Sequence, residues 1–418
     1  MDDSPGFVRA MPAAEASGSC SAAGDPDLIR EVGDWLIREG RFAADNAELF
    51  ARFCERISAH SVPLDRAYLH LRALHPQYRG VSRIWKPGEP LSERFIDYAI
   101  EKTATYIESS VRVVVEQRQR LEWRLDNNNA LPFATLEELR EQGYSHYVIA
   151  PLPYATAGLT NALSWATRRP GGFTAAHLHL FDALLPVYAT LVEAKALWRF
   201  STNMLTTYVG REPARFILEG QVRRGDVRTI TAALMLVDLR DFTLLSDRES
   251  PRSVIRMLND YFDCVFPPVQ SHGGDIMEIM GDGVLAIFHQ GPDSNAAEAC
   301  NAALAAATEA LAEVAERNRR HPPGAPVLQA GIALHYGTVS YGNIGSGDRL
   351  DFTVIGPDVN LTSRIERLCR ELDRHLILSE AFAEALGRPM WELGAFELRG
   401  FSRMQRLFEP PPEELNEG

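Results

Sequence analysis

Two aspartates stand next to apolar runs that are typical of strands. Asp238 follows the run Ile230–Val237, and Asp282 lies between two glycines directly before the run Val284–Phe288. The flanking glycines favour a tight hairpin at Asp282. Carboxylates held on adjacent strands bind hard divalent cations such as Mg²⁺, and two such ions can hold the attacking and leaving oxygens of a phosphoryl displacement. Either aspartate alone would be read as a turn residue, but together they predict a metal site.

A third stretch adds side chains that could contact a nucleotide. Phe352–Ile355 favours a short strand that Gly356 and Pro357 end, and a helix is expected to begin near Asp358. Asn360 and Arg364 are four residues apart, so they project from one helix face. An Arg there can meet charge that builds up on a phosphate, and an Asn can hold a sugar oxygen.

The three segments VDLRDFT, GDGVLAIF and DFTVIGPDVNLTSRIE together resemble the catalytic domain of class III adenylate and guanylate cyclases. They occur in the order and approximate spacing of that family, over residues 228–410. The resemblance implies an α+β fold with a ferredoxin-like βαββαβ core, a sheet with helices on one face. It also implies conversion of a nucleoside triphosphate to the 3′,5′-cyclic monophosphate and pyrophosphate.

The resemblance further implies roles for individual residues. Asp238 and Asp282 would bind two Mg²⁺ or Mn²⁺ ions, Asn360 would orient the ribose, and Arg364 would stabilise the transition state. Arg399 would contact the triphosphate. Backbone amides facing the β- and γ-phosphates are expected in the run after the first aspartate: Leu239, Arg240, Asp241, Phe242 and Thr243. Because the family draws the aspartates from one protomer and the Asn and Arg from the other, a homodimer with two shared sites is implied.

Two positions bear on the choice of base. Glu278 stands where the family's adenylate cyclases usually carry a Lys, and Thr353 stands at the partner position. A carboxylate only accepts hydrogen bonds, so Glu278 suits the N1 and N2 donors of guanine and opposes adenine N1. A buried mismatch costs about 1–3 kcal/mol, and GTP is therefore slightly favoured.

ATP remains an alternative, because Thr353 does not discriminate and the segment around it resembles bacterial adenylate cyclases. A second alternative is an inactive cyclase-like regulator that only binds nucleotide. The presence of Asp238, Asp282, Asn360 and Arg364 together argues against that alternative.

Length and composition set the broad class. A chain of 418 residues favours two domains, and a net charge of −13 argues against a nucleic-acid-binding surface. The five cysteines form no CxxC pair, which is typical of thiols in a reducing cytoplasm. We expect a disordered N-terminus over residues 1–24, a tail over 411–418, no membrane span, no signal peptide and a cytoplasmic location.

Residues 25–200 predict a second domain. Helical periodicity to residue 59 is followed by strand-like segments at 67–72, 80–85, 147–153 and 158–167, and then by a long helix from Ala175 to Phe200. This order resembles a GAF-like or PAS-like sensor, which would bind a small-molecule ligand, but the sequence singles out no residues for one. Glycines and a proline within residues 201–227 predict a linker to the cyclase domain.

Overall fold

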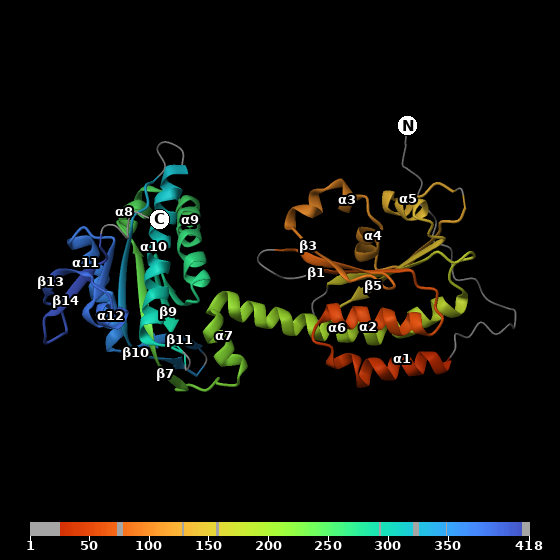
Figure 1. The fold of residues 1–418 in the computed structure, drawn as a ribbon. Coiled ribbons are helices and arrows are strands. Elements are labelled where there is room, and N and C mark those ends of the chain that lie inside the picture. The colour runs from red at the N-terminus through yellow and green to blue at the C-terminus, as the bar shows by residue number, and fades with distance from the viewer. Residues whose placement is uncertain are drawn as a thin grey trace. The chain divides into compact units, whose positions relative to one another are not determined.

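The structure is a computed structural model that describes residues 26–72, 78–127, 129–155, 159–291, 294–320, 326–347 and 349–411. These residues form two compact units that divide between Ser201 and Thr202. The expectations for residues 1–24 and for the tail from 412 onward lie outside the described residues. Figure 1 shows the elements of each unit.

The N-terminal unit is built on a six-stranded antiparallel sheet with the order β3-β2-β1-β6-β5-β4. Its strands are β1 (Arg66–Arg72), β2 (Gly80–Trp85), β3 (Ser92–Ile96), β4 (Leu121–Arg124), β5 (His146–Pro153) and β6 (Thr160–Thr167). The β1–β2 hairpin follows the alternation of apolar and polar residues in the sequence.

Helices cover both faces of this sheet (Figure 1). On one face, apolar residues of α1 (Pro26–Arg38), α2 (Asn46–Ala59) and α6 (Ala175–Val209) pack on Leu69, Trp85 and Trp165. On the other face, α4 (Ser110–Gln117) and α5 (Ala134–Glu141) pack on Tyr147 and Ile149. Short helices η1 (Gly40–Phe42), η2 (Tyr98–Lys102) and α3 (Ala104–Ile107) complete the unit. Assignment of this unit to the GAF-like or PAS-like class stays a prediction.

Helix α6 is longer than the sequence indicated. It runs past Phe200 to Val209, and its buried residues end at Glu193. By length and composition alone this helix could cross a membrane, and a third of its most apolar window is buried. A single such helix is weak evidence of a span, so the expectation of no membrane span stays a prediction.

The second unit contains an eight-stranded sheet with the order β13-β14-β12-β10-β7-β9-β8, and β11 also pairs with β10. Its central strands are β7 (Val227–Leu239), β8 (Asp275–Met280), β9 (Gly283–His289) and β10 (Ala330–Ser346). The remaining strands are β11 (Arg349–Ile355), β12 (Leu376–Ser379), β13 (Trp391–Phe396) and β14 (Gln405–Glu409).

The core of this unit has the predicted βαββαβ order. Between the central strands lie α8 (Phe242–Arg248), α9 (Pro251–Ser271) and α10 (Ala296–Arg320). Along β7, Ala233, Met235 and Val237 face α9, α10 and α12 (Glu380–Leu386), whereas Leu234 and Leu236 face the opposite side. The strict alternation of β7 thus buries both sides of the strand.

Two features differ from the sequence-based expectation. Helix α11 (Pro357–Glu371) packs on Ala333 and Ile377, on the face opposite α9 and α10, so the helices of this unit do not all lie on one face. The predicted linker contains the end of α6 and a further helix, α7 (Arg211–Leu218). Gly210, which has a φ of +98°, directly precedes α7.

A buried histidine fixes the start of α11 on the sheet. His335 on β10 is 4% exposed; its Nδ1 lies 2.8 Å from Ser379 Oγ, and its Nε2 lies 3.5 Å from Asp358 Oδ1. The other carboxylate oxygen of Asp358 accepts the Thr338 amide at 2.7 Å. Three elements, β10, β12 and α11, therefore meet at one imidazole.

We expect His335→Phe to loosen this junction, because Ser379 and Asp358 each lose a partner. The loss of stability should be about 1–3 kcal/mol. Hydrogen–deuterium exchange should quicken in β10, β12 and the first turn of α11. His179→Phe, at an exposed site on α6, is the control and should leave these segments unchanged. Equal protection in both variants would refute this role for His335.

Candidate active site

The structure brings Asp238 and Asp282 to the same end of the sheet. Asp238 follows Val237, which pairs with Val284 on β9. Asp282 lies in the two-residue turn that joins β8 to β9, and Gly281 takes the left-handed φ of +70° that this turn requires. A Cβ at Gly283 would lie 3.7 Å from Asp238 Oδ1, which shows how closely the hairpin approaches that carboxylate.

The carboxylate of Asp238 is strongly affected by burial and by Asp282. Burial, followed by the charge and hydrogen bonding of Asp282, raises the pKa of Asp238 to about 7. Glu366 on α11 is a third carboxylate at this place: burial and then the charge of Asp238 raise its pKa to about 7. A divalent cation would relieve this repulsion, and oxygen ligands fit Mg²⁺ or Mn²⁺.

Sequence reasoning missed Glu366. The available signal was its place two residues after Arg364, but that spacing puts it on a different side of α11. Tight packing of α11 on β10 places Glu366 beside Asp238. A Cβ at Gly331 would lie 3.1 Å from Glu366 Oε1, and Gly331 pairs with Asp238.

The residues expected to read the base contact each other. Thr353 Oγ1 on β11 donates to Glu278 Oε2 on β8 at 2.9 Å. The β10–β11 hairpin makes this contact because Phe352 and Val354 pack on Met277 and Leu285, on the sheet face opposite α9 and α10. In this arrangement the threonine hydroxyl donates to the carboxylate, so toward a ligand both side chains present acceptors.

The run after Asp238 has fewer free amides than expected. The Leu239 amide donates to Asp238 Oδ1 at 3.2 Å, and the Arg240 amide donates to the Gln329 carbonyl at 2.7 Å. These bonds correct the prediction for Leu239 and Arg240, and leave it for Asp241, Phe242 and Thr243 at the start of α8.

The Arg240 side chain also has hydrogen-bond partners of its own, and Arg399 lies in a different loop from Arg240. The guanidinium of Arg240 donates to Asp373 and to the carbonyls of Cys369 and Arg374, at 3.1, 2.8 and 2.6 Å. Arg240 therefore anchors the end of α11. Arg399 is exposed in the turn between β13 and β14.

Asn360 lies in the first turn of α11, at the end of the helix away from the aspartates, and Arg364 lies about one turn further along the helix. Helix α11 begins beside Thr338, and Thr338 is seven residues along β10 from Gly331, the partner of Asp238. Asn360 is six residues before Glu366, so the two lie about 9 Å apart along the axis of α11, with Glu366 beside Asp238. Asn360 is exposed and Arg364 half-buried. Within one chain, Asn360 is therefore set apart from the aspartates along α11.

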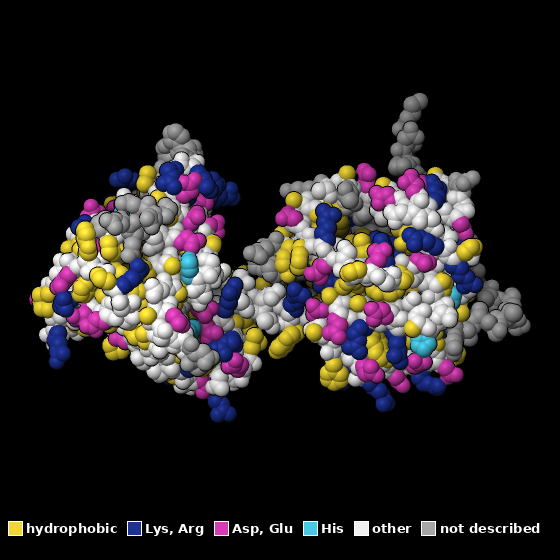
Figure 2. Space-filling view, viewed as in Figure 1, with side chains coloured by type: hydrophobic (Ala, Val, Ile, Leu, Met, Phe, Trp, Pro, Cys, Tyr) yellow, Lys and Arg dark blue, Asp and Glu magenta, His cyan; other side chains and the backbone are white. Residues whose placement is uncertain are grey.

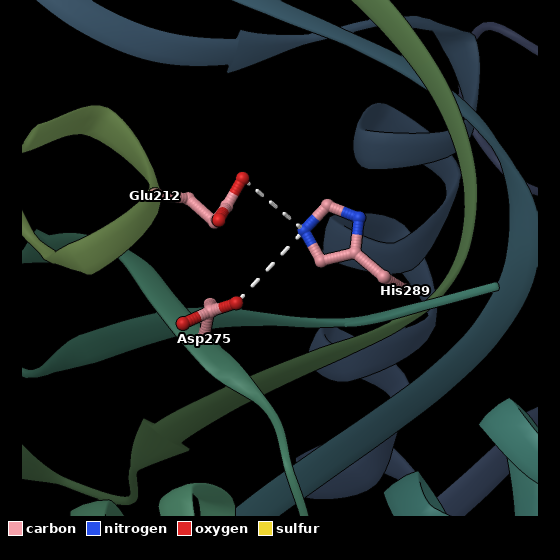
Figure 3. Close-up of side chains that lie close together, drawn as sticks. All are labelled: Glu212, Asp275 and His289. Atoms are coloured by element: carbon pink, nitrogen blue, oxygen red, sulfur yellow. Dashed lines mark ion pairs between the residues drawn. The ribbon is translucent and has the colours of Figure 1, made fainter. Parts of the chain in front are cut away.

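A second group of side chains could hold a cation (Figure 3). His289 Nε2 on β9 lies 3.9 Å from both Glu212 Oε2 on α7 and Asp275 Oδ2 on β8, and the three ligand atoms lie within 4.8 Å of one another. The pKa of His289 is lowered, because burial outweighs the opposing effect of the two carboxylates. Sequence reasoning missed this group, because it depends on α7.

This group lies apart from the aspartate pair. His289 pairs with Ala232, six residues before Asp238, which places it roughly 20 Å along the strand. Arg215 already holds both oxygens of Glu212, at 2.9 and 2.6 Å. We assign the group to anchoring α7 on the sheet.

Comparisons with known proteins bear on residues 227–405. This segment matches the family model described as the adenylate and guanylate cyclase catalytic domain. Adenylate cyclase of Anabaena cylindrica is 32% identical over 167 residues, which are 40% of this chain and 32% of the relative. Adenylate cyclase 1 of Rhizobium meliloti (strain 1021) is 33% identical over 149 residues, 35% of this chain and 22% of the relative.

A solved structure, that of the guanylyl cyclase Cya2, is 31% identical, with a TM-score of 0.38, and the match covers 44% of this chain and 93% of that one. The matches to the two curated relatives span only about a third and a fifth of their lengths. The chain therefore carries, in residues 227–405, a catalytic domain of the class III adenylate and guanylate cyclase family.

Proposed function

We propose that this chain forms a 3′,5′-cyclic nucleotide and pyrophosphate from a purine nucleoside triphosphate, as a homodimer with shared sites. The observation that carries the proposal is the pairing of Asp238 with Asp282 at one sheet end, where burial and then the charge of Asp282 raise the pKa of Asp238 to about 7. Two acids with such mutual repulsion are typical of a divalent metal site.

Divalent ions bound at this pair would lower the pKa of the ribose 3′-hydroxyl and neutralise the triphosphate. The residues present fit such ions, since Asp238, Asp282 and Glu366 supply only oxygen donors. Free amides at the start of α8 would face the β- and γ-phosphates, as helix N-termini often do.

The remaining groups of the site would come from the partner protomer. Within one chain, Asn360 lies in the first turn of α11, away from the aspartate pair, and the family resemblance takes this residue from the other protomer. A head-to-tail dimer would place Asn360 at the ribose and Arg364 at the charge that develops during displacement.

Figure 2 shows basic and acidic side chains interspersed on the face drawn, which differs from the basic stripe of a nucleic-acid-binding protein.

GTP is the substrate that the Glu278–Thr353 contact favours. With the threonine hydroxyl donating to Glu278 at 2.9 Å, both side chains offer acceptors. Guanine offers two adjacent donors, N1–H and the N2 amino group, whereas adenine offers only N6 beside the acceptor N1. Adenylate cyclase activity is the second candidate, and the names of the two relatives favour it.

The substrate is tested by supplying GTP and ATP together with Mn²⁺ to purified protein. We expect mainly cyclic GMP, and we expect Glu278→Lys to shift the product toward cyclic AMP, because an ammonium donates to adenine N1. Thr353→Val, which removes the hydroxyl and keeps Glu278, should retain the preference for GTP. An unchanged product ratio in Glu278→Lys would remove this residue from base recognition, and absence of any cyclic product would refute the cyclase proposal.

Shared sites are tested by mixing two inactive variants. Asp282→Ala lacks a metal ligand and Arg364→Ala lacks the guanidinium, so a heterodimer would hold one intact site and one doubly altered site. Random pairing makes about half of the dimers heterodimers, so activity should recover to about one quarter of wild type. Mass spectrometry should confirm that heterodimers form, and their formation without recovery would contradict the shared site.

The aspartate pair predicts a pH dependence in metal-free protein. A carboxyl whose pKa is raised to about 7 in the fold stabilises the protein at low pH, and this contribution is lost as pH rises through 7. In EDTA, Asp238→Asn should therefore melt above wild type at pH 8, with a smaller gap at pH 5. Asp247→Asn, on the exposed side of α8, is the control. A gap that does not change with pH would contradict the predicted repulsion.

A further inference from the structure

A cavity opens on one face of the N-terminal sheet. Its volume is about 440 Å³, within the range of clefts that hold small organic ligands. It lies where the end of β1 meets α3 and α4, and its walls are Arg72, Tyr106, Ile107, Arg112, Val115 and Glu116.

The strand that supplies Arg72 carries further polar side chains on the same face. Side chains alternate along a strand, so His70 lies beside Arg72, whereas Leu69 and Leu71 face the helical core of α2 and α6. His70 is 5% exposed, and its Nδ1 has no hydrogen-bond partner among the described residues. His70 is therefore a buried polar neighbour of Arg72, although it does not line the cavity itself.

The charge of the cavity is positive at its floor. Arg112 donates to Glu116 at 2.8 Å and to the Ile107 carbonyl at 3.1 Å, which neutralises the helical wall. The guanidinium of Arg72 makes no ion pair within the part of the chain that the structure describes. Burial, then Arg72 and Arg79, lower the pKa of His70 to about 4, so the imidazole is neutral and the surrounding potential favours an anion.

The remaining wall is apolar. Val115 is buried and belongs to the core under α4, and Ile107 is 44% exposed beside it. We propose that this cavity binds a small organic anion, whose carboxylate or phosphate pairs with Arg72 and whose apolar body lies against Ile107 and Val115. The site lies in the N-terminal unit and uses no residue of the proposed cyclase reaction, so either proposal can fail without the other.

The proposal is tested with benzoate and phenyl phosphate as probes, and with benzyl alcohol as the neutral control. Saturation-transfer NMR on the full chain at millimolar probe should show binding of the anions and little binding of the alcohol. The stronger of the two anions identifies the preferred group, carboxylate or phosphate.

Variants locate the site. Arg72→Gln should weaken binding about tenfold or more, because a charge-assisted bond is lost. Its backbone amide still donates to Asn161 Oδ1, so the fold is retained, and melting should confirm this. Arg72→Lys keeps the charge and should keep most of the binding, and Arg30→Gln, on exposed α1, should bind as wild type. Equal binding of benzyl alcohol, unchanged binding in Arg72→Gln, or no anion binding to wild type would each overturn the proposal.

Discussion

The catalytic unit depends on two carboxylates that the fold holds together against their repulsion. Asp238 and Asp282 meet because β7 and β9 are neighbours and a two-residue turn ends β8 at the same place. The cost is visible in the raised pKa of Asp238 and of Glu366 behind it. The core offsets this cost, since β7 is buried on both sides by α9, α10 and β11.

The two halves of helix α11 have different roles in the proposed dimer. Its C-terminal half brings Glu366 toward Asp238, and Arg240 ties its end to the loop after β7. Its N-terminal half, fixed by His335, holds Asn360 away from the aspartate pair. The same helix thus supports one aspartate pair and, in the proposed dimer, would serve the pair of its partner.

Site residues that lie within short sequence motifs could be predicted from the sequence, whereas residues that only packing brings to the site could not. The apolar run before Asp238 and the glycines around Asp282 indicated strand ends and a hairpin, and the structure contains both. The place of Glu366 depends on which side of α11 meets Gly331, and no periodicity reveals that. Gly210 and Gly220 predict a linker, but in the structure these glycines flank helix α7. The sequence predicts free amides at Leu239 and Arg240, but the fold provides both with partners, Asp238 Oδ1 and the Gln329 carbonyl, that no local pattern reveals.

In the proposed mechanism, Asp238 and Asp282 hold two metal ions at one nucleotide. Electron paramagnetic resonance of Mn²⁺ titrated into the protein with a non-hydrolysable GTP analogue measures whether they do. Two ions about 3.5–4 Å apart should give a strongly coupled spectrum at two Mn²⁺ per site, and Asp238→Asn should abolish the coupling. Uncoupled Mn²⁺ in wild-type protein, or coupling that persists in Asp238→Asn, would contradict the account.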